Sequence, residues 1–342
     1  MESIYWVLAW ACHRKCRHCY EDRFRPYVRA DLETVVAEAE ANLPRVVAHL
    51  PERMTYRDGG QERVGRIILS GGEALLEATR ERVTYRAIEA LSARYRDRGG
   101  VRIVVQTTGD LLTPDIVRAL LDRGVWMISV AGVDDFHVGI EGPERQARFT
   151  AGLAAMFAAA GMRPSGEQAP VRAWHEEEGP VFSFFGATPE MWIGKLWPRG
   201  RAWQNGLSTA GLEDNFCARW SGGLNFLRHG EAGSEVSIEP DGAVYPCCLK
   251  TKLPIGSLLE ESLIAILDGL ADDAVYQAID AGAPQRMGLA LGWSEEMFIA
   301  KSHTLTPQGR PYANLCVGCD RFHEEVLAPR IAAARARRQA PA

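Results

Sequence analysis

Near its amino terminus the chain reads IYWVLAWACHRKCRHCY over residues 4–20. Residues 4–11 form an apolar run typical of a buried strand, and three cysteines follow closely, at Cys12, Cys16 and Cys19. Thiolates are the usual ligands of iron–sulfur clusters. Three of them on one tight loop can bind three corners of a four-iron cube and leave the fourth iron open, as catalytic zinc sites leave one position open. The spacing therefore predicts a metal centre that performs chemistry.

A second motif follows another strand-like run. The segment RIILS at residues 66–70 leads directly into Gly71-Gly72-Glu73. Two glycines let the backbone approach a ligand closely, and a carboxylate accepts strong hydrogen bonds from an ammonium group. The turn is therefore a candidate ligand-binding element.

Together these motifs resemble the signature of radical S-adenosylmethionine (SAM) enzymes. In that family the C-x3-C-x2-C spacing is followed by an aromatic residue, here Tyr20, and a Gly-Gly-Glu-Pro turn binds the amino group of SAM. The proline is replaced by Ala74 in this chain, which loosens the turn but keeps both glycines and the carboxylate. The resemblance implies a 4Fe–4S cluster whose open iron binds SAM, and SAM contacts at Tyr20, Gly71, Gly72 and Glu73.

Strand-like and helix-like segments alternate through the first two thirds of the chain. We expect strands at residues 4–11, 67–70, 101–106, 125–130 and 181–185 and near 191–197, helices at 31–50, 81–98, 114–123 and 143–160, and loops at 51–65 and 162–180. Such alternation predicts parallel strands whose following loops share one end of the sheet. The family resemblance implies a fold of class α/β with a partial (β/α)6 TIM-like barrel.

Polar residues also follow the fourth expected strand. Ser129, near its end, is similar in position to family residues that contact the ribose of SAM, although a serine in a strand also fits a cross-strand hydrogen bond. Asp134, Asp135 and His137 lie in the loop that follows. Ordinary turn chemistry and contact with substrate or SAM are both open for these three residues.

The remaining five cysteines lie in the last third of the chain. Cys217 is followed by GAVYPC at residues 242–247 and by CVGC at residues 316–319. A cysteine, then G-x4-C, then C-x2-C resembles the auxiliary-cluster domain called Twitch, the shorter relative of SPASM. This resemblance implies a smaller α+β domain with one auxiliary 4Fe–4S cluster held by Cys217, Cys247, Cys316 and Cys319. Cys248 would then be spare, with its side chain on the opposite face of an extended segment.

Zinc is the alternative metal for both cysteine sets, because zinc and iron–sulfur sites use the same thiolates. His13 or His18 could complete a zinc site at the first set, but both sit inside the cysteine loop. Four thiolates at the second set fit structural zinc as well. The alternative function is therefore a zinc-stabilised, non-catalytic binding protein.

Composition narrows the class of protein. The 342 residues are 46% hydrophobic and 24% charged, with a net charge of −5, which is typical of a globular protein. The sequence has no stripe of basic residues, which argues against general nucleic-acid binding. We recognise neither a secretory signal nor an apolar run long enough to span a membrane. Eight cysteines in such a chain favour metal binding over disulfides. We expect a cytoplasmic protein.

The motifs and the resemblance together predict three regions and one function. Residues 1–205 would form the barrel, 206–330 the Twitch/SPASM-like auxiliary-cluster domain and 331–342 a tail. The enzyme would cleave SAM reductively, with oxidoreductase- or transferase-type radical chemistry and an auxiliary cluster for electron transfer. The first expected strand starts at Ile4 with no peptide-binding domain before it, so we expect a small molecule or short peptide as substrate. Reduced flavodoxin or ferredoxin is the expected electron donor.

Overall fold

The computed structural model describes the chain apart from residues 25–27, 167–176, 188–195, 220, 329, 331–332, 334–335 and 338–342. Most of the strand expected near residues 191–197, the middle of the loop expected at 162–180 and most of the predicted tail lie outside the described residues. Among the helices that are described, none is long and apolar enough to cross a membrane.

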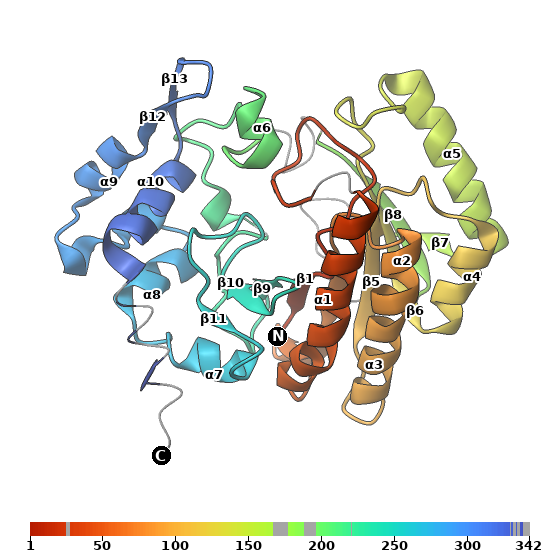
Figure 1. Cartoon of the computed structure of the whole chain (residues 1–342). Helices are drawn as coiled ribbons and strands as arrows, with labels where there is room; N and C mark the ends of the chain where they lie inside the picture. The colour runs from red at the N-terminus through yellow and green to blue at the C-terminus, as the bar shows by residue number, and fades with distance from the viewer. Residues whose placement is uncertain are drawn as a thin grey trace.

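One sheet runs through the described part of the molecule, in the strand order β11-β10-β9-β1-β4-β5-β6-β8-β7 (Figure 1). The pairs from β9 through to β7 are all parallel, whereas β10 and β11 are antiparallel. The strands are β1 (Ser3–Val7), β4 (Arg66–Ser70), β5 (Arg102–Thr107), β6 (Val125–Ala131), β7 (Arg163–Pro164), β8 (Val181–Phe185), β9 (Glu235–Ile238), β10 (Ala243–Tyr245) and β11 (Gly256–Ser257).

Helices connect the parallel strands, as crossovers between parallel strands require. They are α1 (Arg29–His49), α2 (Glu77–Thr79), which continues through a π-helical turn (Arg80–Thr84) into α3 (Tyr85–Tyr95), α4 (Pro114–Asp122) and α5 (Pro143–Ala159). Figure 1 shows them on one side of the molecule, in red to yellow-green. The α/β class with helical crossovers is therefore confirmed.

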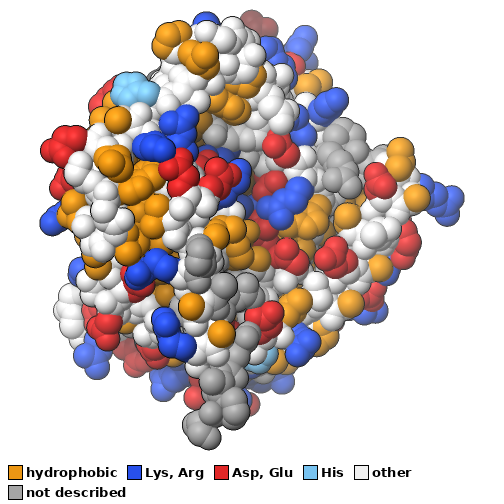
Figure 2. Space-filling view, turned by 60° about the vertical axis from the view of Figure 1, so that its left-hand side comes forward, with side chains coloured by type: hydrophobic (Ala, Val, Ile, Leu, Met, Phe, Trp, Pro, Cys, Tyr) orange, Lys and Arg blue, Asp and Glu red, His pale blue; other side chains and the backbone are white. Residues whose placement is uncertain are grey.

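The carboxy-terminal part carries shorter elements, drawn in green to blue in Figure 1. They are α6 (Gly200–Gln204), α7 (Leu263–Asp268), α8 (Ala274–Asp280), α9 (Glu295–Lys301), α10 (Leu315–Phe322), a π-helical turn (His323–Leu327), 3-10 turns at Phe216–Ala218, Pro284–Arg286 and Leu289–Leu291, and the hairpin of β12 (His303–Leu305) and β13 (Pro311–Ala313). Acidic and basic side chains are interspersed over this face of the molecule (Figure 2).

The local sequence explains most element boundaries. Thr113 caps α4 by accepting a hydrogen bond from the Ile116 amide, as a threonine before a helix should. One expectation was wrong, because residues 51–65 are not a loop throughout. They contain a hairpin of β2 (Thr55–Asp58) and β3 (Gln61–Val64). Gly59 and Gly60 both have positive φ, and this two-residue turn suits the twist of a hairpin.

The two predicted domains share this sheet. Strand β9, from the predicted second domain, pairs with β1 in parallel, and Ser3 lies opposite Glu235. Strand β4 pairs with the other edge of β1, so that Ser3 also lies opposite Arg66. The loop after β1 therefore leaves the sheet between the carboxyl ends of β4 and β9.

A buried group of four charged side chains joins that loop to the carboxy-terminal part. The Lys250 ammonium lies 2.5 Å from Glu21 and also contacts Glu239. Arg23 pairs with the same two carboxylates at 2.8 Å each and stacks on the Trp10 ring, 3.7 Å from its centroid. Burial alone would raise the pKa of Glu21, but Arg23 and Lys250 outweigh it and lower that pKa to about 2. Glu21 therefore stays ionised, whereas burial outweighs the two cations at Glu239 and raises the pKa of that carboxyl. The contacts of the group hold residues 20–24 against residues 239–250.

Replacing Lys250 tests this link. We expect Lys250→Met to lower the free energy of unfolding by about 3 kcal/mol, because removing one partner leaves buried charge only partly compensated. The matched control is Lys252→Met, since Lys252 is 53% exposed and pairs with Glu324, itself 51% exposed. Exposed pairs contribute less than about 1 kcal/mol. Denaturant titration of both variants in the same metal-loading state measures the difference, and equal effects would contradict the argument.

Candidate functional site

The turn after β4, Gly71–Glu73, is hydrogen-bonded to the residues that lead into the cysteine loop. The Leu8 amide donates to the Ser70 carbonyl at 2.8 Å, and the Gly72 and Glu73 amides donate to the carbonyls of Ala9 and Ala11 at 3.1 and 2.9 Å. These contacts join the two sequence motifs directly. A methyl group on Gly72 would lie 2.1 Å from the Ala11 carbonyl oxygen and 2.9 Å from Cys12 Cβ, so only glycine fits there.

The three thiols of this loop are shielded from water. Cys12 and Cys16 are buried and Cys19 is half-buried. Burial raises the pKa of Cys12 to about 12 and that of Cys19 to about 11. Cys12 and Cys19 therefore keep their protons at neutral pH until a metal displaces them. A cysteine loop of this kind fits a thiolate-bound metal cluster.

Glu73 is the centre of a hydrogen-bond network at the same end of the sheet. Its side chain is 2% exposed. One carboxylate oxygen accepts from the Leu75 amide at 2.9 Å and from the Thr107 hydroxyl at 2.7 Å, and the other accepts from the Thr108 amide at 2.8 Å and the Thr108 hydroxyl at 2.7 Å. Two amides and the Thr107 hydroxyl thus donate to this carboxylate, whereas the single proton of the Thr108 hydroxyl is shared between Glu73 and Asp110 Oδ1, which lies 2.5 Å away. Glu73 thus locks the turn after β4 to the turn after β5.

The loop after β5 also reaches the cysteine loop. Asp110 accepts hydrogen bonds from Arg14 Nε at 3.0 Å and from the His13 ring at 2.7 Å. Arg14 Nη1 in addition donates to the Val138 carbonyl at 2.7 Å, beyond β6. The loops after β1, β4, β5 and β6 therefore meet at one end of the sheet, as the strand alternation predicts.

Ser129 lies at this end of β6 but bonds across the sheet. Its hydroxyl is 3.0 Å from the Ser183 hydroxyl of β8, and the residue is 9% exposed. This is the cross-strand arrangement that the sequence left open. Asp135 accepts hydrogen bonds from the Gly142 amide and the Gln146 side chain, at 2.9 and 3.0 Å, which is turn chemistry.

Asp134 and His137 form a closed cluster beside His18. Asp134 accepts from the Phe136 and Ala187 amides at 2.9 Å each and from the His137 ring at 2.8 Å. Burial would lower the pKa of His137, but its bond to Asp134 raises that pKa to about 9. Burial and the charge of His137 lower the pKa of His18 to about 4. Their ligand atoms lie close enough together to hold a metal ion, and Asp134 already accepts three hydrogen bonds of the four that a carboxylate can take.

Tyr20 points into the interior between the two parts of the chain. Its ring packs edge-on against Trp197 and Phe24, with centroids 5.8 and 5.9 Å away. Its hydroxyl lies 3.5 Å from that of Tyr5, which in turn lies 2.7 Å from the Ser70 hydroxyl. The backbone of Cys19 and Tyr20 lies against Gly200, where a methyl group would come within 2.6 Å.

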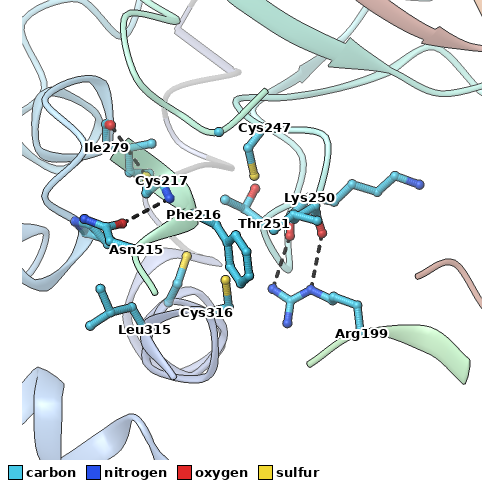
Figure 3. Close-up of a pocket in the computed structure, with 14 residues that line it drawn as sticks. Arg199, Asn215, Phe216, Cys217, Cys247, Lys250, Thr251, Ile279, Leu315 and Cys316 are labelled. Atoms are coloured by element: carbon cyan, nitrogen blue, oxygen red, sulfur yellow. Dashed lines mark hydrogen bonds between the residues drawn. The ribbon is translucent and has the colours of Figure 1, made fainter. Parts of the chain in front are cut away.

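A second cysteine site lies in the carboxy-terminal part. Cys217, Cys247, Cys316 and Cys319 line one cavity, and Figure 3 shows Cys217, Cys247 and Cys316 around its space. Burial raises the pKa of Cys247 to about 11 and that of Cys316 to about 12, and it also raises the pKa values of Cys217 and Cys319. Four half-buried cysteines at one cavity are a donor set that fits a 4Fe–4S cluster or zinc.

Two asparagines position these ligands in the same way. The Asn215 side chain accepts from the Cys217 amide at 3.0 Å, and Asn314 accepts from the Cys316 amide at 2.9 Å, where it caps α10. Cys316 and Cys319 are three residues apart on α10 and so share a face. The repeated Asn-x-Cys pattern is a sequence signal that the motif analysis missed.

Cys248 does not line this cavity. Its amide donates to the Ser221 carbonyl at 3.0 Å. Cys247 thus lines the cavity and Cys248 does not, although both pack against the apolar cluster that contains Trp197 and Phe216.

Comparison with known proteins identifies one region. Residues 231–289 match the family model SPASM, an iron–sulfur cluster-binding domain. This match includes Cys247 and Cys248 and confirms the prediction of an iron–sulfur domain in the carboxy-terminal part. No curated protein matches the sequence.

Several solved structures share a general similarity with the chain. They include BtrN in complex with AdoMet and 2-DOIA (TM-score 0.42, 15% identity, 82% of this chain and 88% of that chain). They also include anSMEcpe with bound AdoMet and Cp18Cys peptide (TM-score 0.42, 13% identity, 97% of this chain and 98% of that chain). A third is Streptococcus suis SuiB bound to precursor peptide SuiA (TM-score 0.43, 14% identity, 86% of this chain and 74% of that chain). Scores and identities this low do not establish a shared function.

The close approach at Gly72 gives a testable prediction. We expect Gly72→Ala to lose the iron of the cysteine loop, because the added methyl group must displace the backbone at residues 11–12. The control is Gly152→Ala in α5, where nothing lies within 4 Å of the new methyl group. That change should keep all iron and stabilise the helix by about 0.5–1 kcal/mol. The measurement is the iron and sulfide content per chain of both variants after anaerobic reconstitution. A full iron content in Gly72→Ala would refute the steric argument.

The two adjacent cysteines give another prediction. In a chain with Cys12, Cys16 and Cys19 all changed to alanine, only the second site can hold iron. There Cys247→Ala should remove most of the iron, because it deletes one of four ligands. Cys248→Ala should leave the iron content unchanged. The reverse result would mean that Cys248 is the ligand.

Proposed function

We propose that this protein is a radical SAM enzyme that reductively cleaves S-adenosylmethionine and uses the resulting radical to modify a small molecule or short peptide. One observation carries the proposal most directly. The Gly71–Glu73 turn hydrogen-bonds to residues 9 and 11, immediately before Cys12, at the carboxyl end of a parallel sheet. A three-thiol loop and a glycine turn in direct contact are the parts that such a site needs.

Each residue would have a defined task in this function. Cys12, Cys16 and Cys19 would hold a 4Fe–4S cluster with one iron left for SAM. Gly71 and Gly72 would let the backbone approach the cofactor, Glu73 would fix the turn through its hydrogen bonds, and the Tyr20 backbone and Ser129 would line the SAM site. When bound and reduced, the cluster supplies the electron that cleaves SAM to a 5′-deoxyadenosyl radical, which takes a hydrogen atom from the substrate.

The second site would carry electrons rather than substrate. Four cysteine ligands would leave its cluster without an open position, so accepting or relaying an electron is the role that suits it. A two-electron oxidation, or radical bond formation followed by oxidation, fits that role best. Reduced flavodoxin or ferredoxin would supply the first electron. The SPASM match at residues 231–289 supports iron rather than zinc at this site.

The test is anaerobic incubation of the reconstituted protein with SAM and dithionite. We expect a brown protein that forms 5′-deoxyadenosine. Cys16→Ala should abolish product, whereas Cys248→Ala, which removes a cysteine outside both proposed ligand sets, should keep SAM cleavage. Chromatography of the nucleosides measures both. A protein that binds SAM yet forms no 5′-deoxyadenosine would contradict the proposal, and methylthioadenosine would show that a different C–S bond is cut. A colourless zinc protein would favour the binding-protein alternative.

A further inference from the structure

The turn at residues 197–202 touches both cysteine sites, through two arginines that point to opposite sides. Arg201 serves the first site. Its backbone amide donates to the Cys19 carbonyl at 2.8 Å, its Nε to the Cys16 carbonyl at 2.9 Å, and its Nη1 to the Phe24 carbonyl at 2.6 Å. Arg199 turns instead to the second site, where it lines the cavity of the four cysteines.

All donor groups of the Arg199 guanidinium have partners in the described structure. Two bonds run to the Asp320 carboxylate, from Nη1 at 2.7 Å and from Nη2 at 2.8 Å. Nε donates to the Leu249 carbonyl at 3.2 Å, and the two remaining bonds run to the carbonyls of Lys250 and Pro198, both at 3.3 Å. Figure 3 shows the two bonds to residues 249 and 250. A planar fork of fixed donors can make such a set, and a lysine cannot.

These bonds connect the segments that carry three of the four cysteines. Leu249 and Lys250 follow Cys247 by two and three residues, and Asp320 follows Cys319 directly on the helix that also carries Cys316. Arg199 thus fixes the Cys247 segment relative to α10. The distance between their thiols depends on that contact, and cluster ligands must be held at defined spacing.

The same residue brings a positive charge to the cavity wall. Its side chain is 17% exposed. Arg199 lines the cavity of the four cysteines and Asp320 does not, so the cation lies nearer to the cavity than the paired carboxylate does.

We propose that Arg199 is a positioning residue of the second site, which holds the Cys247 segment against α10 and raises the reduction potential of the cluster bound there. This inference rests on the proposed auxiliary cluster. Reduction adds negative charge to a cluster, and a fixed cation at the wall favours the reduced form. Net charge and hydrogen bonding are known determinants of cluster potentials. A higher potential suits a cluster that accepts an electron from the substrate radical.

The experiment uses the full chain with Cys12, Cys16 and Cys19 changed to alanine, so that SAM chemistry plays no part. Iron and sulfide content and an EPR-monitored redox titration are measured for Arg199→Met, Arg199→Lys and Asp320→Asn. We expect Arg199→Met to bind less iron and to shift the midpoint potential to more negative values. Arg199→Lys should also lose iron, because it loses the fork, but should keep a potential nearer that of the parent. Asp320→Asn removes an anion and should shift the potential to more positive values.

The control is Arg286→Met, since Arg286 is 59% exposed and its contact with Glu295 is 3.7 Å long. It should change neither measurement. Full iron and an unchanged potential in Arg199→Met, or shifts of the same sign in Arg199→Met and Asp320→Asn, would overturn the inference. If Arg199→Met holds no iron, Asp320→Asn decides the electrostatic part, and a midpoint potential that is unchanged or more negative in that variant would overturn it. A parent chain that holds zinc but no iron would overturn this inference and the auxiliary cluster together.

Discussion

Strand β1 pairs in parallel with β4 on one side and with β9 on the other. Parallel strands bring their carboxyl ends to the same edge of a sheet, so this double pairing fixes what can meet the cysteine loop. On the β4 side it meets the glycine turn, and on the β9 side it meets the segment that leads into the second cysteine site. Both cysteine sites are therefore positioned relative to a single strand.

Two further contacts make that arrangement stiff, and both lie between the sites. The ionic group of Glu21, Arg23, Glu239 and Lys250 joins the residues after Cys19 to residues on both sides of Cys247 and Cys248. The turn at residues 197–202 binds the carbonyls of one cysteine loop through Arg201 and the ligand segments of the other through Arg199. Charge buried in this way is costly unless every partner is present.

The sequence motifs predicted the residues of the site better than the long-range contacts that hold them in place. The C-x3-C-x2-C loop, the Gly-Gly-Glu turn and the strands before them are local patterns, and the structure places them together because their spacing follows the alternation of strand and helix. Glu73 shows the limit of that reasoning. Its position in the turn was evident, but its bonds to Thr107 and Thr108 depend on how β4 and β5 are paired. The hairpin at residues 55–64 was not predicted because its Asp-Gly-Gly segment was interpreted as part of a loop rather than as a turn between two strands.

The sequence by itself determined that three thiols share one short loop, because the spacing of Cys12, Cys16 and Cys19 is local, and it left both an iron–sulfur cluster and zinc open as the bound metal. It also determined the α/β class, since alternating apolar runs and amphipathic helices have few ways to bury their faces. Only the tertiary structure decided which distant groups serve the two sites. Arg199 and Asp320 are 121 residues apart, and no local pattern links them. An arginine suits many surroundings, and its partners are set by the packing of segments that meet only once the whole sheet has formed.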